Sequence, residues 1–200
     1  MNKSLMVIAA ILLSGCSILP SDKPKDIATY DLGIFSPPTS QTTLASHILV
    51  PAVEAPQWLE GPGIYYRLGY QNSARLQPYA NSRWVAAPAS LITLRLRQRF
   101  AHASSKGATT PDDISRADYV LRVQVEEFSQ VFDTPTGSTA IVRMTANLIG
   151  AKDRLLVAQK SFSVNRAATT ADAAGGVRAL SEAVDETINQ ILEWSSKTAK

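Results

Sequence analysis

Three β-rich segments joined by short turns, all in the second half of the chain, place the tightest limit on how it folds. In residues 119–126 (YVLRVQVE), apolar and polar side chains alternate, which is the pattern of a strand with one buried face. Turn-forming stretches at 133–138 and 150–154 lead into further β-rich runs at 139–149 and 155–164. Parallel neighbours would need a crossover of about a dozen residues or more, so these short links predict an antiparallel meander.

Two segments carry apolar side chains at helical spacing. Residues 87–103 begin with Pro88, which the first turn of a helix tolerates, and present a broad apolar face. Residues 172–197 place one apolar stripe at steps of three and four, and at 1.5 Å per residue this helix would be roughly 37 Å long. We therefore predict an α+β fold, with a mixed, largely antiparallel sheet and two helices packed on one face. The opposite face is left for solvent or a partner.

The first half of the chain predicts shorter strands. Residues 30–35 and 47–53 read as short strands, and Pro51 places the second one at a sheet edge. Residues 64–70 form a β-rich run, and residues 76–84 predict a short strand followed by a turn. These strands would extend the sheet that the meander begins.

The start of the chain has the layout of a secretory signal peptide. Lys3 precedes an apolar run at 5–13, and small residues follow before Cys16, which is the only cysteine. The apolar run covers about nine residues, against roughly 20 for a helix that crosses a bilayer, so a permanent span is not expected. A lone cysteine cannot form an internal disulfide, which leaves another role for this thiol or an incidental place near the end of the signal peptide.

The tetrapeptide LSGC at 13–16 resembles the lipobox of bacterial lipoproteins, in which cleavage falls just before the cysteine. The resemblance implies that residues 1–15 are a cleaved signal peptide and that Cys16 becomes the first residue, carrying diacylglycerol on sulfur and an acyl chain such as palmitate on nitrogen. Two or three such chains, at about 0.8 kcal/mol per buried methylene, make a stable anchor. Ser17, where an Asp would favour the inner membrane, implies the outer membrane, with the domain facing the periplasm.

The composition of the mature chain indicates two parts and a nearly balanced charge. Residues 16–29 mix Pro, Lys, Asp and Ser and predict a lipidated tether, and residues 30–200 form one domain. Removing residues 1–15 takes away Lys3 and no acid, so the formal net charge falls from +3 to +2, which argues against a nucleic-acid-binding protein. The nearby Arg95, Arg97 and Arg99 do not all share one helix face, and we expect them to be solvated.

The chain shows no catalytic or metal-binding signature. It has no phosphate-binding glycine loop, no G-x-S-x-G and no H-E-x-x-H, and its histidines are His47 and His102. The acid pair Asp112-Asp113 falls in a polar loop, and we expect the pair Glu126-Glu127 to point to opposite strand faces. We therefore predict neither a catalytic site nor a cofactor or metal, and a chain that binds or braces a partner.

A series of short landmarks along the domain resembles the ABC-type transport auxiliary lipoproteins. They are, in order, VPAV at 50–53, PQWL at 56–59, GPGI at 61–64, Arg67, Tyr79, SRW at 82–84, ADYVL at 117–121, Phe162, AL at 179–180 and ILEW at 191–194. The resemblance implies a lipoprotein that works with the permease and ATPase of an ABC transporter and with an MCE-type substrate-binding protein. Such a system moves phospholipid or other hydrophobic molecules between the inner and outer membranes.

Two questions stay open at this level. An alternative function is a lipoprotein scaffold for envelope assembly or secretion, without any transporter, and whether the chain forms a homo-oligomer is not decided. The candidate partner-binding residues are Trp58 and Leu59, in the breaker-rich loop 56–63, and Trp84. Ordinary core packing is the competing interpretation of these side chains. Trp58 also departs from the family pattern, in which a tyrosine is usual.

Overall fold

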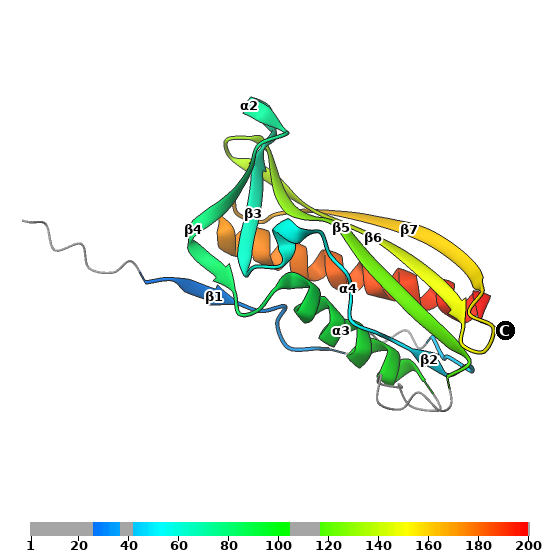
Figure 1. Ribbon diagram of the computed structural model, residues 1–200. Helices are drawn as coiled ribbons and strands as arrows, with labels where there is room; N and C mark the ends of the chain where they lie inside the picture. Colours follow the sequence, from blue (N-terminus) through cyan, green and yellow to red (C-terminus); the bar gives the residue numbers. More distant parts are fainter. Residues whose placement is uncertain (1–25, 37–41, 105–116, 200) are drawn as a thin grey trace, which may run out of the picture.

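A single mixed sheet with two long helices on one face makes up the part of the chain that the structure describes (Figure 1). The computed structural model describes residues 26–36, 42–104 and 117–199. Its strands are β1 (Ala28–Tyr30), β2 (Ile48–Leu49), β3 (Gly63–Leu68), β4 (Leu76–Trp84), β5 (Tyr119–Thr134), β6 (Gly137–Gly150) and β7 (Leu156–Ala167). Its helices are η1 (Gln57–Leu59), α2 (Gly69–Asn72), α3 (Pro88–Ala103) and α4 (Ala173–Thr198).

The strand order confirms the predicted meander and α+β class. The order is β1-β4-β3-β5-β6-β7, with β2 also paired to β5, and both β5–β6 and β6–β7 are antiparallel. The long strand β5 serves two parallel neighbours on its other edge, β2 near its start at Tyr119 and β3 near its end at Gln130. The predicted strand at 47–53 is only Ile48–Leu49, which ends before Pro51, and its one strand partner in the described sheet is β5, so its predicted edge position is confirmed.

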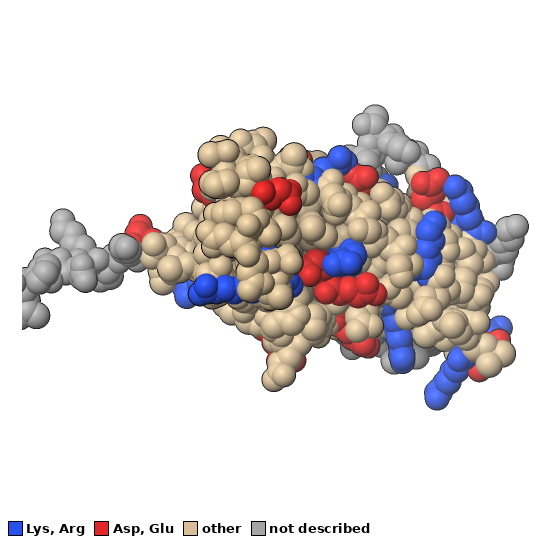
Figure 2. Space-filling view, turned by 90° about the horizontal axis from the view of Figure 1, so that it is seen from above, with Lys and Arg blue, Asp and Glu red and all other residues tan. Residues whose placement is uncertain are grey.

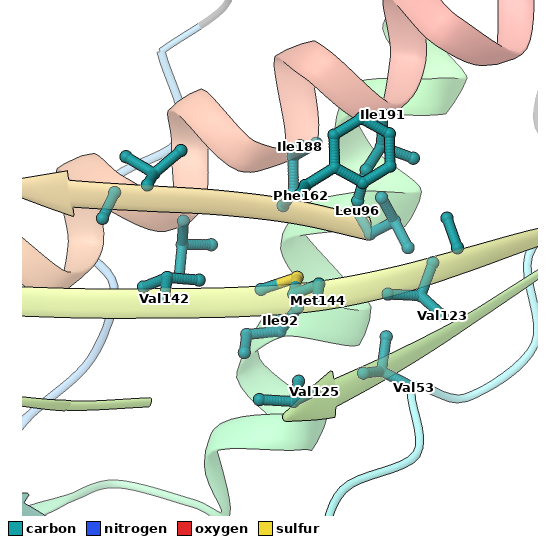
Figure 3. Close-up of a cluster of buried hydrophobic side chains, with 14 of the residues drawn as sticks. Val53, Ile92, Leu96, Val123, Val125, Val142, Met144, Phe162, Ile188 and Ile191 are labelled. Carbon is teal, nitrogen blue, oxygen red and sulfur yellow. The ribbon is translucent and has the colours of Figure 1, made fainter. Parts of the chain in front are cut away.

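The core lies between the sheet and the two helices. Ile92 and Leu96 of α3, together with Ile188 and Ile191 of α4, point at the sheet (Figure 3). They meet the inward side chains of the meander, which include Val123, Val125, Val142, Met144 and Phe162. All of these side chains are buried, and each contributes about 1.5–3 kcal/mol on removal from water. The helical stripe and the strand alternation are therefore two halves of one core.

Several predicted boundaries differ from the structure. The first strand is Ala28–Tyr30 and not residues 30–35, so it begins inside the stretch assigned to the tether. The predicted turn in residues 76–84 is wrong, because β4 is a continuous strand. It stays extended because its backbone is paired on both sides, with β3 antiparallel and β1 parallel.

A β-bulge changes the placement of the acid pair in β5. The register steps from Val125 opposite Met144 to Glu127 opposite Arg143, which inserts Glu126 as an extra residue. Glu126 accepts a hydrogen bond from Thr145 Oγ1, and Glu127 pairs with Arg143, which also faces away from the helices. The expectation that the two carboxylates point to opposite faces is therefore wrong, because the bulge places both of them on the outer face.

Candidate contact surface

The N-terminal anchor region lies largely outside the described residues. Cys16, the predicted lipid attachment site, is among the residues that are not described, and its acylation stays a prediction. The described chain begins at Asp26, next to β1, at the end of the molecule away from the β6–β7 turn (Figure 1). A tether attached there would hold the domain by that end.

The loop 56–63 separates its two candidate residues. Leu59 closes the short η1 turn, donating from its backbone N to Pro56 O at 2.8 Å, and its side chain is fully buried. Trp58 is only partly buried, with its ring edge-on to Tyr65 at 5.4 Å between centroids. Burial removes Leu59 from the contact surface, whereas Trp58 keeps exposed area and stays a candidate.

Trp84 lies in the core. Its side chain is 1% exposed and its ring lies 5.5 Å from that of Phe128. Its Nε1 has no hydrogen-bond partner among the described residues. A partner could reach this side chain only after the sheet opened, so Trp84 is a packing residue and does not belong to a surface. In this sequence, the polar Arg83 beside it was no guide to exposure.

The segment after β1, residues 31–35, bends at Leu32 and borders both long helices, and we call it the strap. Arg95 of α3 holds the strap, because its Nη2 donates to Leu32 O at 2.5 Å and to Gly33 O at 2.6 Å. The same guanidinium lies 5.7 Å from the centroid of the Phe35 ring. Its Nε faces Asp185 Oδ1 of α4 at 3.6 Å. One side chain therefore links the strap, α3 and α4.

The prediction that the three arginines of α3 are solvated is wrong. Arg95 is 4% exposed and Arg99 is 5% exposed. Arg99 Nε donates to Asn189 Oδ1 of α4 at 2.7 Å, and burial lowers the pKa of its guanidinium. Arg97 is half-buried and donates from Nε to Val50 O at 3.0 Å. The buried pair lies four residues apart, on the helix face turned to α4, where each guanidinium finds an acceptor.

Two clefts flank the strap. The larger, about 650 Å³, lies between the strap and α4 and is lined by Asp31, Val85, Val177 and Asp185, among others. Burial raises the pKa of the Asp185 carboxyl, and the charge of Arg95 opposes the rise. The smaller cleft, about 410 Å³, lies between the strap and α3. Its rim includes Ile34, Val85 and Leu94, all exposed, so the surface around the strap is partly apolar.

The histidines and acidic residues that the sequence analysis considered as catalytic or metal-binding candidates are dispersed where the structure describes them. His102 at the end of α3 is exposed and lies edge-on to Phe35, and His47 lies just before β2. Glu127 is paired with Arg67 at 3.3 Å and with Arg143 at 3.9 Å. Asp112 and Asp113 lie outside the described residues. Within the described ranges, no three His, Cys, Asp or Glu side chains come together as metal ligands would.

The fold and these surfaces define a class, a two-layer α+β domain with clefts on either side of the strap that follows β1. In the described part of the chain, none of the helices has the length and apolarity needed to cross a bilayer. The sequence model of the ABC-type transport auxiliary lipoprotein component matches residues 30–192, and the chain belongs to that family. It is thus an auxiliary lipoprotein component of an ABC-type transport system.

Comparison with solved structures supports the fold. A Xanthomonas campestris protein of the DUF330 family has a TM-score of 0.74 at 19% identity, covering 86% of this chain and 96% of that chain. An uncharacterized protein gives a TM-score of 0.61 at 15% identity, covering 86% of this chain and 99% of that chain. The PelC dodecamer from Paraburkholderia phytofirmans gives 0.44 at 13% identity, covering 81% and 94%, and nothing is inferred from it. No curated protein matches the chain.

Proposed function

We propose that the chain is a non-catalytic outer-membrane lipoprotein of an ABC transport system that includes an MCE-type substrate-binding protein. Residues 1–15 are the cleaved signal peptide, residues 16–29 are the tether that begins at the acylated Cys16, and residues 30–200 are the auxiliary domain. The system moves phospholipid or another hydrophobic molecule between the inner and outer membranes. The observation that carries the proposal is the family match over residues 30–192, which starts where the predicted tether ends.

The domain acts as a brace that a short tether holds close to the membrane. Between Cys16 and Asp26 the chain spans at most about 36 Å, at about 3.6 Å per extended residue. The strap that follows is fastened by Arg95 to both long helices, so the direction in which the tether leaves is fixed relative to the core. A rigid exit of this kind lets the membrane anchor set the height and orientation of the domain. Partner subunits would then meet a surface at a defined distance from the bilayer.

The anchor is tested by replacing the thiol. In Cys16→Ser, labelled palmitate is not incorporated and an uncleaved precursor accumulates, because the acylation that precedes cleavage has lost its nucleophile. In the native chain, mass spectrometry of the mature polypeptide should give an N-terminus at residue 16 and a mass above that of the bare amino acids. Equal labelling of the native chain and Cys16→Ser would contradict the anchor.

The transport partners are tested by capture. The full chain with a C-terminal affinity tag is recovered from a mild detergent extract of the producing cells, and the recovered proteins are identified by mass spectrometry. We expect an ATPase, a permease and an MCE protein, with recovery reduced in Cys16→Ser, which serves as the matched control for membrane placement. Recovery of secretion or envelope-assembly components with no MCE protein would favour the scaffold function.

A further inference from the structure

The outer face of the meander, which points away from the helices, is polar along most of its length. Side chains that lie side by side across β5, β6 and β7 form rows on this face, and two consecutive rows are Arg122–Asn147–Gln159 and Gln124–Thr145–Ser161. Their exposed members are charged or amide side chains or a serine. A face of this composition is suited to water.

One row at the end of the sheet is different. Val120, Ile149 and Leu156 are direct cross-strand neighbours on β5, β6 and β7, so three aliphatic side chains lie next to one another on the outer face. Leu155 and Val157 flank the last of them. Leu155 is 65% exposed, Leu156 59% and Val157 47%. This end of the sheet therefore presents a row of partly or fully exposed aliphatic side chains, and Leu155 and Val157 expose further apolar area beside it.

A small pocket with two arginines adjoins the apolar row. It has a volume of about 270 Å³, and its lining includes Val120 and Ile149 together with the side chains of Arg122 and Arg154. Arg122 and Arg154 are exposed, and among the described residues neither guanidinium has a hydrogen bond or ion pair. Lys152 lies in the same turn and is also exposed. In Figure 2, most of the visible Lys and Arg side chains lie over the right-hand part of the molecule, with Asp and Glu side chains among them.

Two acids lie near the pocket, and the backbone already engages both. Asp118 Oδ2 accepts a hydrogen bond from His47 N at 2.9 Å, and Asp153 Oδ1 accepts one from Leu155 N at 3.0 Å. Both carboxylates therefore stabilise turns at this end of the sheet. Within the described ranges, they leave the two guanidiniums without a bound counter-charge.

The backbone of Arg154 is unusual. Its φ is 58°, and it is the one non-glycine residue with positive φ in the described ranges. A side chain in this left-handed region costs roughly 1–2 kcal/mol, which glycine would avoid. A residue held in a costly conformation beside a pocket is a candidate for a functional role. Here the turn carries a guanidinium to the pocket where a glycine would be the easier choice.

We propose that this end of the sheet is a peripheral binding site for the surface of a bilayer that contains anionic phospholipid. Arg122 and Arg154 pair with a lipid phosphate over the pocket, a geometry that guanidinium favours. Leu156 of the apolar row and the exposed Leu155 before it enter the boundary of the acyl chains. A soluble phosphate would use the cations and leave the leucines in water, so the bilayer explains both halves of the surface.

The site lies apart from β1, because the β6–β7 turn, which carries Arg154, is at the other end of the long axis of the molecule in Figure 1. It does not depend on acylation, and it is tested with a chain that has no lipid. The chain used is residues 16–200 with Cys16→Ser, which contains every residue of the buried core cluster. Flotation is measured with phosphatidylcholine vesicles that contain or lack phosphatidylglycerol.

The protein is expected to float with the anionic vesicles and to bind at least about fivefold more weakly to phosphatidylcholine alone, with salt reducing the binding. Arg154→Gly separates binding from folding, because it removes the guanidinium and relieves the backbone. It should bind about fivefold more weakly while unfolding at the same or a higher temperature. Leu156→Ser should also weaken binding. Arg83→Gln, which removes an exposed cation from β4, is the matched control and should bind as the parent does.

Three results would overturn the proposal. The first is flotation that is equal with and without phosphatidylglycerol, or none at all. The second is equal loss of binding in Arg83→Gln and Arg154→Gly, which would mean attraction by net charge alone. The third is complete displacement by glycerol phosphate with no effect of Leu156→Ser, which would assign the pocket to a soluble anion and not to a bilayer.

Discussion

Arg95 Nε of α3 and Asp185 Oδ1 of α4 face each other at 3.6 Å, and the same guanidinium holds two carbonyl oxygens of the strap. The Arg95 side chain is 4% exposed, whereas that of Asp185 is 47% exposed. The contact is therefore lopsided, since most of the desolvation falls on the arginine. The interactions that offset the desolvation of Arg95 come from the strap carbonyls as much as from the Asp185 carboxylate. Arg95 therefore fastens the strap to the helices, in addition to the burial of Leu32 in the core and the contact of Phe35 with His102.

Replacing Arg95 by methionine keeps the aliphatic stem and removes the charge. We expect a loss of about 2–3 kcal/mol in the free energy of unfolding, because two carbonyls lose charge-assisted hydrogen bonds. The loss stays below the roughly 3–5 kcal/mol typical of a fully buried pair, since Asp185 remains in contact with water. Urea denaturation measures it. Arg83→Met, at an exposed position, should change the stability by less than about 0.5 kcal/mol.

The N-cap of α4 makes stability depend on pH. Asp172 Oδ1 accepts from Gly175 N at 2.8 Å, and this hydrogen bond, more than the one from Thr170, lowers the pKa of the carboxyl. A lowered folded-state pKa means that the stabilisation is present above the unfolded-state pKa and disappears as pH falls through the folded-state value. Asp172→Ala should therefore cost about 1 kcal/mol at neutral pH and progressively less below about pH 4.

Asp172→Asn is the matched control for this cap. Asparagine accepts the same hydrogen bond without titrating, so the variant should keep most of the stability and lose the acid dependence. Asp185 works in the opposite direction, since burial raises its pKa and its contribution is lost as pH rises through the folded-state value. Thermal unfolding between acid and neutral pH distinguishes the two. An Asp172→Ala cost that did not change with pH would rule out the charged cap.

Patterns within single helices and strands predicted the fold. The features that the sequence did not predict depend on contacts between elements that are far apart in the chain. The meander and α4 follow from periodicity that a short window contains, as in the stripe that includes Val184 and Ile188. The strap does not, because Arg95 lies 63 residues from Leu32 and its other partner comes from α4. The spacing of Arg95 and Arg99 places both on one helix face, but it does not indicate that hydrogen-bond acceptors of the strap and α4 lie opposite that face. Their burial is a property of the assembled layers.

The surface sites show the same limit. Val120, Ile149 and Leu156 are single apolar residues in three separate strands, and only the register makes them neighbours. The bulge at Glu126 lies where the alternation of residues 119–126 ends, and only the register with β6 shows that Glu126 is an extra residue. The sequence predicts the same role for Trp84 and Trp58, because a loop or a turn is expected near each of them. The continuous pairing of β4 is what carries Trp84 into the core.

The N-terminal turn of α4 has no room for a side chain at Gly175. A Cβ built there would lie 2.2 Å from Thr170 O, which is a backbone atom and cannot rotate away. Alanine normally stabilises a helix by about 1 kcal/mol over glycine. In Gly175→Ala we expect the opposite, a loss of about 1–3 kcal/mol, because the chain before the helix must shift. Gly61→Ala, with open space around the new methyl group, should be within about 0.5 kcal/mol of the parent.

Trp58 is the sequence-predicted contact residue that keeps exposed surface, and its role can be separated from packing. Trp58→Ala should cost about 2 kcal/mol, since a partly buried ring and its edge-on contact with Tyr65 are lost. A domain stable by about 5 kcal/mol or more stays folded after such a loss. If Trp58 contacts a transport partner, capture of that partner should fall severalfold. Leu59→Val, which removes one methylene from the adjacent buried residue at about 0.8 kcal/mol, should leave capture unchanged.

A tyrosine in place of Trp58 supplies the second half of that test. Trp58→Tyr keeps an aromatic ring against Tyr65 and should restore most of the stability. Partner capture that recovers together with stability would mean that any aromatic ring serves the contact. Capture that stays low in a stable Trp58→Tyr would mean that the larger indole ring reaches the partner directly. Full capture by Trp58→Ala would assign Trp58 to the packing of the loop against β3 and end its candidacy as a contact residue.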